Sequence, residues 1–124
     1  MFYNCFNLVN GPTIVGNSVN NMYRTFYFCN KMVNGPTSIG NSVVNMVNTF
    51  YNCYNLETAN ISEKSSNLRE TFLNCTKLKE MHIPEYESTS PYERALYYTF
   101  SGCTSLETVN VPENAYIEGT FKDC

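Results

Sequence analysis

The sequence has little of what marks membrane, nucleic-acid-binding or metal-binding proteins. No apolar run approaches the roughly 20 residues that a membrane-spanning helix needs. The formal net charge is −3, and the 8 Lys and Arg residues form no basic cluster that would suit a phosphate backbone. The single histidine, His82, and the lack of any Cys-x-x-Cys pair argue against zinc. We therefore expect no membrane span, no nucleic-acid partner, no metal and no cofactor.

The start of the chain also lacks the basic and apolar regions of a signal peptide, because Met1 and Phe2 enter a patterned segment directly. Charge is scarce in residues 1–50, which carry only Arg24 and Lys31. All 11 acidic residues lie in residues 51–124. The chain is thus neutral and Asn-rich at first and mildly acidic later, and we expect export by another route or a place within a longer protein.

What the chain does contain is one pairing six times over, a phenylalanine three residues before a cysteine. Successive cysteines are 24, 24, 22, 28 and 21 residues apart. A pairing kept at such intervals predicts a coiled stack of similar units instead of a globule with a single core. The pairs are Phe2/Cys5, Phe26/Cys29, Phe50/Cys53, Phe72/Cys75, Phe100/Cys103 and Phe121/Cys124.

Each internal unit carries a wider pattern, of which Leu68, Thr71, Phe72, Cys75 and Leu78 are one example. These spacings place the five side chains on one stripe of a short helical segment. Beyond the stripe, inward apolar and outward polar positions alternate until a proline, as in a short strand. We therefore predict an α/β repeat solenoid, a right-handed coil with a parallel β-sheet of short strands on one face and short helical turns on the other.

Residues 71–84 read Thr-Phe-Leu-Asn-Cys-Thr-Lys-Leu-Lys-Glu-Met-His-Ile-Pro, and residues 99–112 follow the same order almost position by position. Residues 49–61 follow it too, with Ser62 in place of the proline. These units resemble the BspA-type leucine-rich repeat family, which implies a leucine-rich-repeat solenoid. The first two units depart from the pattern at Gly11 and Gly35, where an inward aliphatic residue is expected, so we expect their strands to be shifted, bulged or short.

We expect a single solenoid domain over residues 1–124. Its units are 2–25, 26–49, 50–71, 72–99 and 100–120, followed by a partial unit 121–124. Because both ends stop inside a unit, we expect the chain to be a segment of a longer protein. The open ends would be able to pair with further repeats or with another subunit, which makes self-association an expected property.

The twelve phenylalanines and cysteines of the six pairs are the predicted structural core. Equivalent positions on adjacent coils lie about 4.8 Å apart and point the same way. We therefore interpret the cysteines as a buried ladder of small apolar residues and not as a disulfide framework. Cys5 and Cys124, near the ends, are the positions where we expect exceptions.

The sequence gives little support for catalysis. Glu80 and His82 lie close together on one predicted strand face, yet the repeat places no serine or cysteine beside His82. We predict no catalytic residues.

The outward positions of the strands are the candidate binding surface. Asn and Thr side chains both donate and accept hydrogen bonds, which suits sugars or main-chain groups, although such residues also simply solvate a sheet. The longest unit adds a rim loop with two tyrosines. The candidate residues are Asn10, Asn34, Thr58, Asn60, Glu80, His82, Thr108, Asn110, Tyr86 and Tyr92.

The resemblance implies a non-enzymatic module that is displayed at a cell surface or is otherwise extracellular and mediates adhesion by binding a protein or a glycan. Fold alone does not decide function. The alternative is a structural or receptor-binding component of a virus (phage) particle, such as a fibre or decoration domain.

Overall fold

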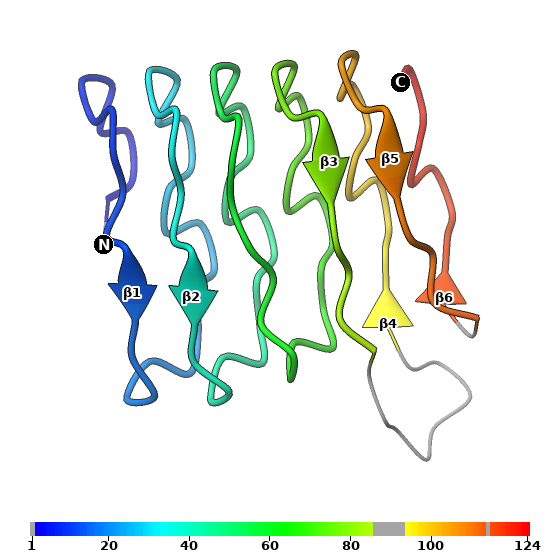
Figure 1. Cartoon of the computed structure of the whole chain (residues 1–124), viewed down its shortest axis with the longest axis horizontal. Coiled ribbons are helices and arrows are strands. Elements are labelled where there is room, and N and C mark those ends of the chain that lie inside the picture. The colour runs from blue at the N-terminus through cyan, green and yellow to red at the C-terminus, as the bar shows by residue number, and fades with distance from the viewer. Residues whose placement is uncertain (1, 86–93, 114) are drawn as a thin grey trace.

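The chain folds into a row of similar coils that stand side by side (Figure 1). The computed structural model describes residues 2–85, 94–113 and 115–124, so Tyr86 and Tyr92 of the predicted rim loop lie outside the described residues. The regular strands are only two residues long. They are β1 (Ile14–Val15), β2 (Ser38–Ile39), β3 (Glu80–Met81), β4 (Arg94–Ala95), β5 (Thr108–Val109) and β6 (Ala115–Tyr116).

Two parallel ladders connect the coils, one on each side of the row. On the front side β1 pairs with β2 and β3 with β5, and on the back side β4 pairs with β6. Figure 1 shows the four front strands pointing one way and the two back strands pointing the other way. Each unit therefore contributes one run to each side, whereas the sequence predicted a strand face on one side only. Isolated bridges extend the front ladder at Asn10, Asn34 and Thr58 and the back ladder at Asn21, Asn45, Asn67 and Ala95.

The predicted helical turns are wrong, because the described residues contain no helix. Each unit makes consecutive tight turns at this place instead. The Cys75 N–H donates to the Phe72 carbonyl at 3.0 Å. The N–H groups of Phe72 and Asn74 instead donate one coil further along, to the carbonyls of Thr99 and Ser101 at 2.9 and 2.8 Å. The φ angles of Glu70 and Asn74 are +52° and +59°, which takes the chain off a helical path. Alternate N–H groups therefore stack the units, whereas an α-helix would use all of them internally.

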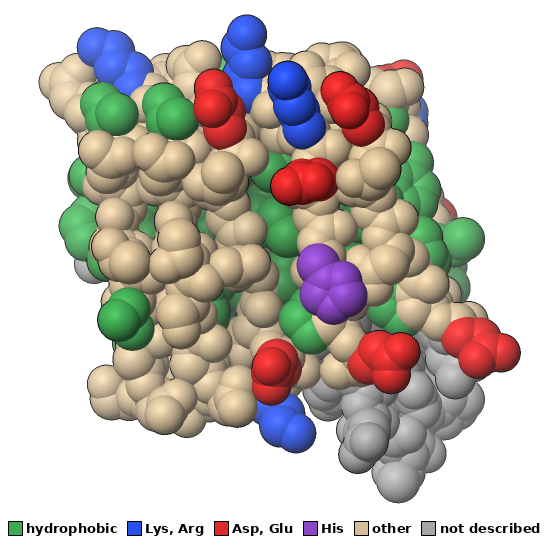
Figure 2. Space-filling view, viewed as in Figure 1, with side chains coloured by type: hydrophobic (Ala, Val, Ile, Leu, Met, Phe, Trp, Pro, Cys, Tyr) green, Lys and Arg blue, Asp and Glu red, His purple; other side chains and the backbone are tan. Residues whose placement is uncertain are grey.

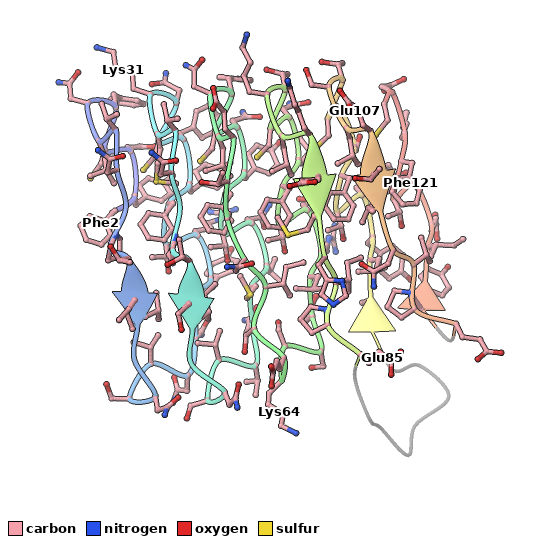
Figure 3. The ribbon with its side chains drawn as sticks, in the orientation of Figure 1. Phe2, Lys31, Lys64, Glu85, Glu107 and Phe121 are labelled. Atoms are coloured by element: carbon pink, nitrogen blue, oxygen red, sulfur yellow. The ribbon has the colours of Figure 1, made fainter. Side chains whose placement is uncertain are left out.

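A continuous stack of phenylalanine rings runs through the row. Neighbouring ring centroids are 5.2 to 5.9 Å apart, and their planes lie within 7° of each other. Phe2 and Phe121, at opposite ends of the row (Figure 3), are each 38% exposed, so their assignment to the core is wrong. Each has a neighbouring ring on one side only. The fully buried rings are those of Phe26, Phe50, Phe72 and Phe100.

The cysteines form a second row beside the rings, and all six are free thiols. From Cys29 onward, each thiol donates a hydrogen bond to the carbonyl of the equivalent phenylalanine one unit earlier, at 2.9 to 3.2 Å. The thiols thus satisfy buried acceptors in addition to filling space. Burial raises the pKa of Cys29 to about 11 and that of Cys103 to about 12. Cys5 is partly buried and Cys124 is exposed, so Cys124 does not belong to the core.

The glycine of the second unit is packed too closely for a side chain. A Cβ on Gly35 would lie 2.9 Å from the Ala59 Cβ and 3.2 Å from the Phe50 ring. The Gly35 N–H donates to the Thr58 carbonyl at 2.7 Å, so the front ladder continues through this position. The regular strands of the first two units begin further along the unit, at β1 and β2, than β3 and β5 do in the later units.

Candidate ligand-binding face

The strand face is the outward side of the front runs, residues 9–14, 33–38, 57–60, 79–82 and 107–110. Its first two segments contain no charged residue. The last three carry Glu57, Lys79, Glu80, His82 and Glu107. Figure 2 shows this division, with uncharged side chains over β1 and β2 and the histidine and several carboxylates over the later units.

Three of the side chains that were predicted to bind a ligand form hydrogen bonds with one another. The Asn34 side-chain amide donates to the Asn10 side-chain oxygen at 2.9 Å, and the Thr58 hydroxyl donates to the Asn34 side-chain oxygen at 3.0 Å. The three side chains form a ladder along the row. The sequence suggested these groups as hydrogen-bonding partners for a ligand, but in the structure they join the first three units. The side chains nevertheless stay exposed.

Two further candidates reach back to the preceding unit. The Asn110 side chain accepts from the Ile83 N–H and donates to the Ile83 carbonyl, both at 2.7 Å. The Asn60 side chain donates to the Thr37 carbonyl. These asparagines act as clamps between neighbouring front runs, and this is a structural role that the sequence did not reveal.

The remaining described candidates are Glu80, His82 and Thr108. All three are exposed, and within the described part of the chain their side chains make no hydrogen bond or ion pair. Sequence reasoning missed two neighbours, Glu57 and Glu107, whose carboxylates are also exposed and unpaired among the described residues. The signal was present, since both stand four residues after the repeat cysteine, at an outward position.

These residues surround an open hollow of about 830 Å³. Its lining consists of strand-face residues of the last three units, within 57–60, 80–82 and 107–110. The lining includes Glu57, Glu80 and Glu107 but no lysine or arginine, so it is acidic. Ala59, Met81 and Val109 supply apolar atoms, and Figure 2 shows hydrophobic side chains between the histidine and the neighbouring unit. The hollow thus combines a partly apolar floor with carboxylates and an imidazole.

Lysines lie on the other side of the carboxylates. A second hollow of about 640 Å³ shares Glu57, Glu80 and Glu107 with the first and is also lined by Lys77 and Lys79. The two lysines make no ion pair with the carboxylates among the described residues. Lys77 and Lys79 therefore border the three carboxylates on the side of the second hollow.

No group of three or more His, Cys, Asp and Glu side chains within residues 2–85, 94–113 and 115–124 is arranged to hold a metal ion. In the same ranges no helix is long and apolar enough to cross a bilayer. What the strand face offers is a surface for contact.

The row of stacked coils, the two ladders and the laterally open strand face define a repeat solenoid. The sequence model of the BspA type leucine-rich repeat region matches six copies over residues 1–124. The chain therefore belongs to the BspA-type leucine-rich repeat family. Comparisons with curated proteins and with solved structures find no match.

Proposed function

We propose that the chain is a non-enzymatic binding module that presents its strand face to a protein or glycan ligand outside the cell, at a cell surface. The observation that carries the proposal is the acidic hollow of the last three units. Glu80, His82 and Glu107 line it, are exposed and have no partner among the described residues. A ligand can therefore bind them without first breaking a contact within the fold.

The thiols argue against nucleophilic catalysis. Burial raises the pKa of Cys53 and Cys75 as well, so these thiols stay protonated and are poor nucleophiles. His82 has no serine, cysteine or orienting carboxylate within hydrogen-bond reach in the described residues, and such partners define a nucleophilic site. A contact role for His82 fits its surroundings better.

Binding can be tested by screening the labelled chain against arrays of glycans and of extracellular proteins. We expect at least one ligand whose affinity falls about tenfold in Glu80→Gln, because a charge-assisted hydrogen bond is lost. Glu113→Gln is the matched control, since Glu113 is exposed and lies outside the hollow. Equal affinity of the two variants for every ligand found would refute the strand face as the binding surface.

Location can be tested by immunogold labelling of the source material with an antibody raised against this chain. Label on cell envelopes is the expected result. Label on virus particles would replace the adhesion proposal with a fibre or decoration role, and label confined to the cytoplasm would contradict both.

A further inference from the structure

The front ladder has a missing rung between the third and fourth units. Between the first two units, the Val33 N–H donates to the Val9 carbonyl and the Gly11 N–H to the Asn34 carbonyl, both at 2.8 Å. The next pair of units makes the equivalent two bonds, at 2.9 and 2.7 Å. The fourth and fifth units are joined here by the pairing of β3 with β5.

Between the third and fourth units the equivalent bonds would run from Lys79 N–H to the Glu57 carbonyl and from Ala59 N–H to the Glu80 carbonyl. Neither is formed in the described part of the chain, and β3 pairs with β5 alone. In Figure 1 the front run of the third unit, next to β3, carries no strand arrow. Four main-chain groups therefore lack their ladder partners. Three of them belong to Glu57, Ala59 and Glu80, which line the acidic hollow, and the fourth belongs to Lys79, which lines the second hollow.

One departure from the later units coincides with the gap. Asn60, His82 and Asn110 each stand seven residues after a repeat cysteine. The two asparagines clamp their own front run to the preceding one, whereas His82 makes no side-chain hydrogen bond among the described residues. An amide presents a donor and an acceptor side by side and can satisfy the N–H and carbonyl of one residue together. A neutral imidazole has its donor and acceptor on opposite edges of the ring and cannot do so.

The gap is confined to the front. Behind it the Asn52 N–H donates to the Leu73 carbonyl at 2.8 Å, and the rings of Phe50 and Phe72 stack at 5.2 Å. The third and fourth units are thus held together at the core, and the notch is the unpaired edge between their front runs at Glu57, Ala59, Lys79 and Glu80. A segment can lie along the notch without unfolding the solenoid.

We propose that this notch binds an extended peptide segment that carries lysine or arginine side chains. The proposal rests on the proposed function and specifies the ligand of the same face. Unpaired strand edges bind extended peptides through main-chain hydrogen bonds, and the notch offers both donors and acceptors. Glu57, Glu80 and Glu107 complement basic side chains, whose aliphatic stems cover apolar floor atoms such as those of Met81. A neutral glycan would leave the three carboxylates without a cationic partner.

The test uses the whole 124-residue chain and a fluorescent synthetic peptide of alternating lysine and threonine, with binding measured by fluorescence anisotropy. Two further peptides separate the contributions, one with glutamate in place of lysine and one with the lysines kept but alternate backbone nitrogens methylated. We expect binding of the lysine peptide and at least about tenfold weaker binding of the methylated one, because main-chain hydrogen bonds are lost. The glutamate peptide should not bind.

His82→Asn tests the notch itself, because the new amide can clamp to Ile61 as Asn110 clamps to Ile83. We expect His82→Asn to weaken the lysine peptide at least about tenfold more than His82→Ala does, which leaves the notch open. Amide hydrogen exchange at Ala59 and Lys79 should slow in His82→Asn and also when the peptide binds to the wild-type chain.

Three results would overturn the inference: no binding of the lysine peptide, equal binding of the methylated peptide, or equal affinities of His82→Asn and His82→Ala. If the ligand screen finds a glycan or protein that Glu80→Gln weakens while any of these three results holds, the strand face is a binding surface and only the peptide assignment fails. If Glu80→Gln weakens no ligand at all, the proposed function fails.

Discussion

Replacing Phe72 with alanine removes a ring from the middle of the stack. The Phe72 side chain is fully buried, and its ring lies 5.2 Å from that of Phe50 and 5.6 Å from that of Phe100. The same change at Phe2 removes a ring that is 38% exposed and has one stacked neighbour, Phe26 at 5.4 Å. The two variants share the chemistry and the place within the repeat, and they differ in position along the row.

Loss of a buried phenylalanine side chain costs about 3 to 5 kcal/mol, since the removed contacts and the remaining cavity both contribute. Phe2 is roughly three fifths buried, and truncating it should cost about 1 to 2 kcal/mol in lost burial. The unfolding free energy of a chain of this size is about 5 to 15 kcal/mol. Phe72→Ala should therefore remove a large fraction of the stability, and Phe2→Ala a small one.

The chain contains no tryptophan, so urea unfolding is best followed by circular dichroism. We expect the Phe72→Ala midpoint to fall well below that of Phe2→Ala, which should lie close to the wild-type value. If the two variants lose the same stability, or if Phe72→Ala loses less than about 1 kcal/mol, the ring stack is not what joins the units.

Three further predictions concern the thiols, the clamps and the ends. Alkaline pH should destabilise the fold, because burial raises the pKa of Cys29 to about 11 and of Cys103 to about 12, so the folded state keeps protons that the unfolded state loses. The contribution of the buried thiols to the unfolding free energy is complete below about pH 8.5, the pKa of a free thiol. Above that pH it falls by up to about 1.4 kcal/mol per pH unit for each thiol. A urea midpoint that stays constant above about pH 8.5 would contradict the argument. Asn110→Ala should cost about 1 to 2 kcal/mol in urea unfolding, because both bonds to Ile83 are lost, and a cost no larger than that of Thr108→Ala would show that the clamp is idle. We also propose that the end units self-associate through their exposed rings, Phe2 and Phe121. Sedimentation velocity should then detect a mass that rises with concentration and a smaller rise in Phe121→Asp, and a single species at all concentrations would reject this.

The repeat and the interior of the core could be predicted from sequence because they depend on spacing alone. Inward residues at intervals of three and four fit a helix and also fit tandem turns. The inward side chains were therefore predicted correctly, but the helical backbone was not. The distinction lies in residues with positive φ, such as Arg24, Phe28 and Glu70. The sequence held part of this signal, because the residues directly before five of the six repeat cysteines (Asn4, Asn52, Asn74, Gly102 and Asp123) are of types that favour positive φ, whereas Arg24, Phe28 and Glu70 are not. Hydrogen bonds to the neighbouring units hold them there, and such bonds are invisible in the local sequence.

The asparagine rows show a second limit of sequence reasoning. An exposed Asn at the same place in successive units suggests a surface that repeats one contact for a ligand. Stacked units also bring equal side chains within hydrogen-bond reach of each other, so the row of Asn10 and Asn34 satisfies itself. Exposure and polarity did not separate these two outcomes.

Departures from the repeat are therefore more informative about function than its matches. A residue that recurs in every unit has the same neighbours each time, and its role is explained by stacking, as the thiols illustrate. His82 stands where the units on either side have asparagine, and the front ladder opens at that unit boundary. The carboxylates gather at the same place. Histidine in place of a clamp asparagine lowers the stability of the fold and forms no new hydrogen bond or ion pair among the described residues. Its coincidence with the acidic hollow therefore favours a binding role for the notch.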